Sequence, residues 1–141
     1  MAFAMECYEK GILTRADTDG IDGIGGHSGA VYHVAWSPDG RHLAVAIAPT
    51  PLVDDRYMAQ TVRIVEAASG EIVATVDREG KLGKMAWSPD GEQLALISAA
   101  DLSDPSASTL MVAPVTGGPP RILGRGFEGS ISDLAWVDDS V

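Results

Sequence analysis

Cysteine and positively charged residues are scarce in this sequence, and both shortages exclude classes of protein. Cys7 is the only cysteine, so the chain can form no internal disulfide and no cysteine-based metal cluster. Ten Lys and Arg residues stand against twenty Asp and Glu residues, which gives a formal net charge of −10. Because such a chain repels phosphate backbones and anionic lipid headgroups, we expect neither nucleic acid nor a membrane among its partners.

Long apolar runs and targeting segments are also lacking. No stretch approaches the ~20 apolar residues of a membrane-spanning helix, and the N-terminal residues show neither the basic start nor the apolar run of a secretion signal. A lone cysteine fits a reducing compartment, so we expect a cytoplasmic protein. The 141 residues suffice for one domain of ordinary size, and a hydrophobic content of 45% favours a folded core over disorder.

An internal repeat is the most informative feature that is present. Its tryptophans recur about every 50 residues, a period that favours a β-propeller blade or a similar β unit over helical solenoids. In the first two repeats an apolar stretch with period two follows, and both alternating sets are apolar, which indicates strands packed on both faces. The repeats are VYHVAWSPDGRHLAVAIA at 31–48, LGKMAWSPDGEQLALISA at 82–99 and ISDLAWVDDS at 131–140, with Trp36, Trp87 and Trp136 at equivalent positions.

A Ser-Pro-Asp-Gly sequence follows the tryptophan in the first two repeats. Proline presets φ for the second position of a type I turn, and serine, aspartate and glycine suit the other three positions. We therefore predict that each of these turns joins two antiparallel strands. The residues that we assign to the structural repeat are Trp36, Ser37, Pro38, Asp39, Gly40, Trp87, Ser88, Pro89, Asp90, Gly91 and Trp136.

The complete pattern predicts an all-β fold, namely a β-propeller fragment with about two four-stranded blades and the first strand of a third. We divide the chain into an N-terminal segment or connector at 1–30, blades at 31–80 and 81–127, and the start of a truncated third blade at 128–141. The expected strands cover about 31–37, 41–48, 60–66 and 71–76 in the first blade, and about 82–88, 92–99, 108–115 and 120–124 in the second.

No catalytic, metal-binding or cofactor-binding motif is complete in the sequence. Residues 26–30 end in Ala30 where a G-x-S-x-G nucleophile elbow needs glycine, and a strand is expected to follow where the elbow needs a helix. The acidic stretch 17–23 lacks the ligand spacing of a calcium loop, and the histidines do not group with carboxylates at metal spacing. We therefore assign no catalytic residue, no metal ligand and no cofactor.

Two features keep both a functional and a structural interpretation. The three tryptophans could stack on a ligand, but equivalent positions in every repeat are typical of packing between blades. Asp54, Asp55 and Arg56 lie in a long inserted loop, where a propeller would present substrate-facing residues, although charged residues at a loop tip are commonly only solvated.

The AWSPDG core, the apolar alternation after it and the later LMVAPVTGGPPRIL segment resemble the WD-like propeller repeats of two families. One is the N-terminal propeller of prolyl-oligopeptidase-type serine peptidases, including acylaminoacyl-peptidase-like members. The other is the TolB-type periplasmic propeller. The insertion at 49–58 is more similar to the peptidase group, because TolB-type repeats usually run shorter there.

The resemblance to the peptidases implies a noncatalytic propeller that covers the active site of a separate C-terminal hydrolase domain and restricts entry to short peptides. The parent protein is then a serine peptidase whose catalytic domain is not in this chain. Its partners are the rest of its own polypeptide, with further blades and a hydrolase domain, and the peptide substrate of the parent. The resemblance to TolB implies instead a protein-interaction scaffold in the periplasm. A third alternative is a short repeat protein that closes a ring from several copies.

Overall fold

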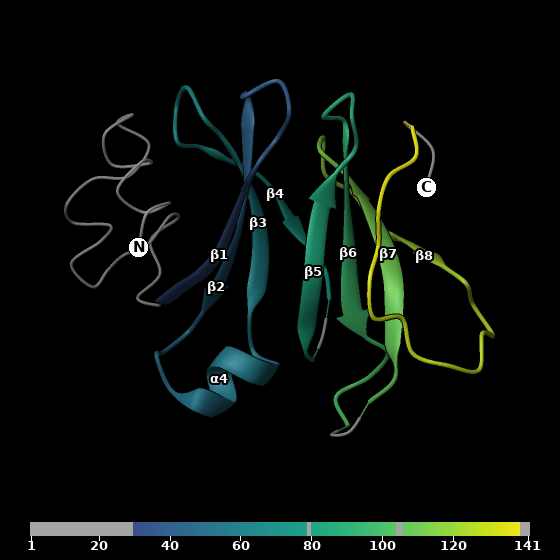
Figure 1. Ribbon diagram of the computed structural model, residues 1–141. Coiled ribbons are helices and arrows are strands. Elements are labelled where there is room, and N and C mark those ends of the chain that lie inside the picture. The colour runs from purple at the N-terminus through teal and green to yellow at the C-terminus, as the bar shows by residue number, and fades with distance from the viewer. Residues whose placement is uncertain (1–29, 79, 104–105, 139–141) are drawn as a thin grey trace.

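The computed structural model describes residues 30–78, 80–103 and 106–138, which form two four-stranded antiparallel sheets, called blade 1 and blade 2 (Figure 1). In each blade the strands pair in chain order. The expected all-β architecture with two four-stranded units is confirmed. Blade 1 consists of β1 (Ala30–Trp36), β2 (His42–Ala48), β3 (Thr61–Glu66) and β4 (Ile72–Val76), and blade 2 of β5 (Leu82–Trp87), β6 (Gln93–Ala99), β7 (Ser108–Pro114) and β8 (Arg121–Leu123).

Strands β2 and β6 are buried on both faces, as their double apolar alternation predicts. Every residue from Leu43 to Ala48 in β2 is buried, and so is every residue from Leu94 to Ala99 in β6. An exposed sheet face would carry polar residues at alternate positions, which neither strand has. Each of these strands therefore needs packed side chains on both of its sides.

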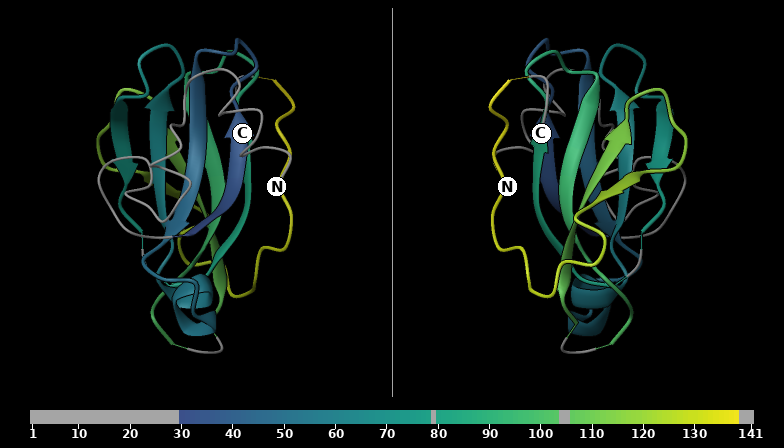
Figure 2. Two further views of the ribbon diagram at one scale, coloured as in Figure 1. Left: turned by 90° about the vertical axis from the view of Figure 1, so that its left-hand side faces the viewer. Right: turned by 90° about the vertical axis from the view of Figure 1, so that its right-hand side faces the viewer.

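An extensive apolar cluster fills the space between the two blades. One face of blade 1 opposes one face of blade 2, and the two views of Figure 2 show each blade in front of the other in turn. Because the cluster takes side chains from both blades, neither blade completes its core alone. Blade 1 contributes Ala44, Ala46, Val62, Ile64, Ala74 and Val76, and blade 2 contributes Met85, Trp87, Leu94, Leu96, Met111, Ala113 and Val115.

Trp87 joins the blades both by packing and by a hydrogen bond. Its side chain is 8% exposed, and its Nε1 donates to the carbonyl oxygen of Ala35 at 2.9 Å. His42 stacks on the same ring, with the ring centroids 6.3 Å apart. Trp136 makes the same contact one unit later, because its Nε1 donates to the carbonyl oxygen of Ala86 at 2.9 Å. Each of these tryptophans thus ties its unit to the first strand of the preceding one.

Trp36, the third tryptophan of the repeat, lies on the other face of blade 1. It is half-buried and packs with Val34 against the buried side chains of Leu43, Val45 and Val65. This cluster is separate from the one between the blades. The two alternating sets of β2 therefore belong to two different cores.

The Ser-Pro-Asp-Gly turns are built around a buried serine hydroxyl. In the first turn Gly40 has a φ of 71°, and its N–H donates to the carbonyl oxygen of Ser37 at 2.9 Å. The Ser37 hydroxyl donates to Asp39 Oδ1 at 2.6 Å and accepts the N–H of His42 at 2.9 Å. Asp39 Oδ1 also accepts the N–H of Arg41 at 3.0 Å. The second turn repeats all of these contacts with Ser88, Asp90, Gly91, Glu92 and Gln93.

These hydrogen bonds lower the pKa of the Asp39 and Asp90 carboxyls below their ordinary value. At both positions the serine hydroxyl is the main cause, followed by the backbone N–H two residues after the aspartate. Both donors stabilise the charged form of the carboxyl group. The turns are therefore bonded most completely when the two aspartates are ionised.

The third repeat lies against blade 2, but residues 125–138 form no β-strand. Leu134 is buried there, with Ile131 and Trp136 beside it, against the apolar face that blade 2 turns away from blade 1. Lys84 Nζ pairs with Asp133 Oδ1 at 2.6 Å. The predicted first strand of a third blade is therefore not formed, although its residues pack on blade 2 where such a strand would lie. A strand needs a hydrogen-bonded neighbour, and none of the described strands pairs with these residues as β2 pairs with β1.

The insertion between β2 and β3 contains a short helix, α4 (Val53–Met58), where the sequence favours a loop. The Thr50 hydroxyl donates to Asp55 Oδ2 at 2.6 Å and accepts the N–H of Leu52, which holds the start of the helix. None of the residues of α4 is buried, so the helix lies on the surface. No helix among the described residues has the length and apolar character needed to span a membrane.

Arg78 lies in the connection between the blades and forms hydrogen bonds with residues on both sides of it. Its guanidinium donates to the carbonyl oxygens of Gln60, at 2.5 Å, and of Gly80, and its Nε donates to the Ser98 hydroxyl at 3.1 Å. Burial lowers the pKa of Arg78 to about 10, so the side chain stays protonated at neutral pH. Its acceptors come from blade 1, from the connection and from blade 2, which fixes the position of the second blade relative to the first.

We expect Trp87→Ala to lower the free energy of unfolding by roughly 3–5 kcal/mol, because it leaves a cavity between the blades. Urea unfolding followed by far-UV circular dichroism measures this loss. Tyr57→Ala removes an aromatic ring that is 55% exposed on α4 and serves as the control. It should change the free energy by less than about 0.5 kcal/mol. A loss below ~1 kcal/mol for Trp87→Ala would contradict its role in packing.

We expect the two turn aspartates to make the protein sensitive to acid. A carboxyl whose pKa is lowered on folding contributes stability above its unfolded pKa of about 4 and loses it as the pH falls through the lower folded-state pKa. The double variant Asp39→Asn and Asp90→Asn should therefore lose less stability than the parent between about pH 4 and pH 2. Urea unfolding at several pH values measures the slopes. Equal slopes for the parent and the double variant would exclude the proposed contribution.

Candidate functional site

The two ends of the blades carry different kinds of connection. The Ser-Pro-Asp-Gly turns lie at one end, called the turn end, together with the turns that join β3 to β4 and β7 to β8 (Figure 1). The opposite end, called the loop end, carries α4, the described residues of the blade connection at 77–81 and of the loop at 100–107, and the segment at 124–131. Binding residues are found disproportionately on loops that a rigid scaffold positions. The loop end is therefore the candidate functional surface.

Large apolar side chains are exposed at the loop end. Tyr57 is 55% exposed, Phe127 64% and Leu52 66%, whereas the apolar residues of the central strands are buried. Single exposed apolar residues are common on proteins, but several at one end of a molecule indicate an interaction surface. The exposed apolar residues of the loop end are Leu52, Val53, Tyr57, Leu102 and Phe127.

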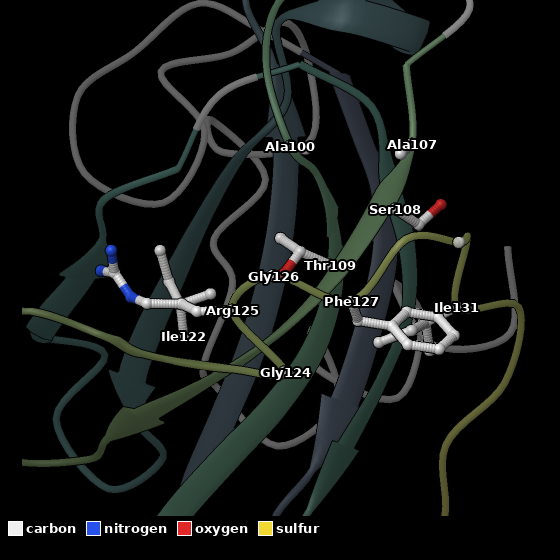
Figure 3. Close-up of a pocket in the computed structure, with 11 residues that line it drawn as sticks. Ala100, Ala107, Ser108, Thr109, Ile122, Gly124, Arg125, Gly126, Phe127 and Ile131 are labelled. Atoms are coloured by element: carbon white, nitrogen blue, oxygen red, sulfur yellow. The ribbon is translucent and has the colours of Figure 1, made fainter.

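A hollow of about 360 Å³, called the outer hollow, lies beside β7 and β8 (Figure 3). Arg125 and Phe127 stand on opposite sides of it, with Thr109 between them (Figure 3). A Cβ on Gly129 would lie 2.6 Å from the Phe127 ring, so the ring packs directly on this glycine. The volume is at the lower end of what small-molecule pockets of about 300–1,000 Å³ offer.

The outer hollow does not have the chemistry of a hydrolytic site. Its Ser108 hydroxyl accepts a hydrogen bond at 3.0 Å from the hydroxyl of Ser130, and a nucleophilic serine needs a base in that place. The described residues that line the hollow include no histidine, aspartate or glutamate that could act as the base. The arrangement can bind an apolar group beside the guanidinium of Arg125, and its described residues include no group that could activate a nucleophile.

A smaller hollow of about 180 Å³, called the inner hollow, lies between β1, β5 and the insertion that contains α4. Tyr32 and His33 come from β1, Arg56 from α4 and Gln60 from the residues just before β3, while Leu82 and Gly83 begin β5. The Arg56 guanidinium carbon lies over the Tyr32 ring, 5.2 Å from its centroid. Four side chains that can donate hydrogen bonds thus meet at one place, and the Gln60 amide already uses one of its two N–H groups for the carbonyl oxygen of Arg56.

A β-bulge explains why two consecutive residues of β1 line the inner hollow. The pairing of β1 with β2 shifts register between Val31 and His33, so that Tyr32 is the extra residue. In a regular strand Tyr32 and His33 would point to opposite faces, and a bulge re-aims side chains at such a position. The pairing of β5 with β6 shifts at the equivalent place, between Leu82 and Met85.

The residues predicted as a substrate-facing loop are divided among different roles. Asp54 lies exposed in the first turn of α4, and Asp55 accepts the hydrogen bond from Thr50 that holds the start of the helix. Arg56 alone reaches a hollow, through its contact with Tyr32. The structure therefore places one of the three charged residues in a candidate site.

The residues of the structural repeat lie away from the loop end. The two Ser-Pro-Asp-Gly turns stand at the turn end, where each aspartate is bonded by its own turn. Trp87 lies in the cluster between the blades, Trp36 in the cluster on the other face of blade 1, and Trp136 packs on blade 2. In the part of the chain that the structure describes, the tryptophans do not line either hollow.

The catalytic and metal-binding motifs that the sequence approaches fall largely outside the described residues. The stretches 17–23 and 26–29 both lie there. Within 30–78, 80–103 and 106–138, no group of three or more His, Cys, Asp or Glu side chains is placed so that it could hold a metal ion.

Sequence reasoning missed most of the residues that shape the loop end. Tyr32, Gln60, Arg78 and Phe127 belong to no motif, and their roles depend on contacts with distant parts of the chain. The repeat does carry one usable signal. Its alignment places Gly83 and Ser132 opposite Tyr32, so this position is not needed for blade packing and is free to take a functional residue.

A comparison with protein families supports the propeller-type fold. Residues 21–48 match the WD40 family, described as WD domain, G-beta repeat. The matched stretch includes β1, the first Ser-Pro-Asp-Gly turn and β2. The chain is thus an all-β protein with two four-stranded antiparallel blades and a WD40 repeat, consistent with a β-propeller fragment.

Among the solved structures that are similar to the chain are the following two. One is described as the eukaryotic initiation factor, with a TM-score of 0.46, 18% identity, and coverage of 63% of this chain and 21% of that chain. The other is a chain assigned as a TolB protein from Agrobacterium tumefaciens, with a TM-score of 0.47, 20% identity, and coverage of 74% of this chain and 34% of that chain. This chain therefore spans about a third or less of the length of these solved chains. No curated protein matches it.

Proposed function

We propose that this chain is a noncatalytic, protein-binding propeller segment that contacts its partner through the loop end. The observation that carries the proposal is the exposure of Leu52, Tyr57 and Phe127 on connections that two packed blades hold in place. Aromatic residues are enriched in protein interfaces and supply much of the binding energy there. The net charge of −10 gives no support to a nucleic-acid partner.

The narrower form of this proposal is that the partner is the hydrolase domain of a prolyl-oligopeptidase-type serine peptidase. The resemblance of the AWSPDG repeats and of the insertion at 49–58 supports it. In such an enzyme the propeller would cover the active site, restrict entry to short peptides and leave catalysis to the other domain. We propose the cytoplasm as its location in that case.

The alternative is a TolB-like propeller that acts as a protein-interaction scaffold. The same repeat motif supports this form equally, because it is common to both families. The partner would then be a separate protein, and we propose a periplasmic location. Both forms require that the loop end binds protein, so identification of the partner distinguishes them.

A photo-crosslinking amino acid at position 57, in the protein expressed in its native host, tests both forms. We expect a crosslink to one partner, identified by mass spectrometry of the crosslinked peptide. A peptide from an α/β-hydrolase domain with a G-x-S-x-G serine supports the peptidase form, and a peptide from an envelope protein supports the scaffold form. Leu52→Asp should reduce this crosslink about tenfold or more, as the loss of an interface hot spot does.

The control carries the same crosslinking group at position 73, where Val73 is 40% exposed on β4. It should give no crosslink to the partner that position 57 captures. Leu52→Asp should leave urea unfolding unchanged within about 0.5 kcal/mol, because Leu52 is exposed. Equal capture from both positions, or capture from position 57 that Leu52→Asp does not reduce, would contradict binding through the loop end.

A further inference from the structure

We propose that the inner hollow is a binding site for a carboxylate group, with Arg56 as its main ligand and Tyr32, His33 and Gln60 around it. This inference goes beyond the proposed function, because the ligand is a small anionic group and the site exists without any protein partner. It rests on the convergence of four donor side chains in a hollow of about 180 Å³.

The donors reach the inner hollow from three separate parts of blade 1. The bulge in β1 brings Tyr32 and His33 to the same place, α4 supplies Arg56, and the chain before β3 supplies Gln60. The carbonyl oxygen of Gln60 accepts a hydrogen bond from the buried Arg78, which holds this part of the backbone in position. The backbone that carries Gln60 beside the hollow is therefore held in a fixed position.

The in-plane N–H groups of the Arg56 guanidinium are oriented so that they can donate to a ligand. Its guanidinium carbon lies over the Tyr32 ring, and a stacked guanidinium uses its face for the ring and leaves its in-plane N–H groups free. No carboxylate among the described residues forms a salt bridge with Arg56. The neighbouring Asp55 instead accepts the hydrogen bond of Thr50. The fork of N–H groups on Arg56 matches the two oxygens of a carboxylate.

The charge and size of the inner hollow favour a carboxylate over a phosphate. Arg56 is the one arginine or lysine among its described lining residues, which matches a group with a single negative charge. Leu82 lines the hollow beside the donors and offers contact to an apolar substituent. The volume lies below the range of about 300–1,000 Å³ that drug-sized ligands need. We therefore infer a ligand that inserts one carboxylate and a short apolar group, such as the C-terminus of a peptide.

Titration of the ¹⁵N-labelled chain, followed by amide NMR shifts of Tyr32 and His33, tests this site. The probes are acetyl-Phe-Ala with a free C-terminal carboxylate, the same dipeptide as its C-terminal amide, acetate and inorganic phosphate. We expect the free-acid dipeptide to shift these amides saturably and the amide to bind at least tenfold more weakly. Tighter binding of the dipeptide than of acetate assigns the site to peptide termini, and equal binding assigns it to small organic acids.

Arg56→Gln should weaken binding of the free-acid dipeptide by roughly tenfold or more, because it removes a charge-assisted pair of hydrogen bonds. Arg125→Gln is the matched control, since Arg125 also lines a hollow of the loop end, and it should change the affinity less than about twofold. Both variants should keep the parental urea unfolding curve. Equal binding of acid and amide, preference for phosphate, no binding of any probe, or equal effects of the two variants would each overturn the proposal. The assay contains no protein partner, so its outcome is independent of the proposed function.

Discussion

The burial of β2 and β6 on both faces is the constraint on which the rest of the structure depends. These strands carry apolar side chains at consecutive positions, so a layer of packed residues must cover each side. Between the blades the two sheets cover each other. On the far side of blade 2, Ile131, Leu134 and Trp136 provide the cover without forming a paired strand. Each unit of about fifty residues thus repeats both a sheet and the apolar interface with the next unit.

Three polar side chains inside this apolar stack have specific partners. The indole N–H groups of Trp87 and Trp136 reach a carbonyl of the preceding unit, which gives each interface a fixed alignment. Arg78 binds carbonyl oxygens and a hydroxyl from both blades. Buried polar groups without partners destabilise a fold, whereas bonded ones select one arrangement of the layers. These bonds therefore determine how the blades sit on each other, while apolar burial supplies most of the stability.

The two ends of the blades differ in how closely their connections repeat. At the turn end, each aspartate is bonded by its own turn, and the two turns make the same set of contacts. The loop end differs between the blades, because blade 1 carries α4 and blade 2 carries the outer hollow. Repetition is expected where every unit must pack alike, and variation where a unit meets a ligand or partner. The inner hollow is lined by Arg56 and other hydrogen-bond donors, although the chain as a whole has a net charge of −10.

The sequence by itself determined the blades. Period-two alternation, the tryptophan spacing and the Ser-Pro-Asp-Gly turns act over a few residues, so the eight strands and their order could be predicted from local patterns. Only the tertiary structure decided the candidate sites. Tyr32 meets Arg56 because a bulge turns one residue of β1 and because the insertion forms a helix, and neither event has a local signature in the sequence. Arg78 and Phe127 likewise gain their roles from residues that the fold brings near. Alternation and turn chemistry are encoded within a strand or a turn, whereas a hollow is formed by side chains from separate strands and exists only when the blades have packed.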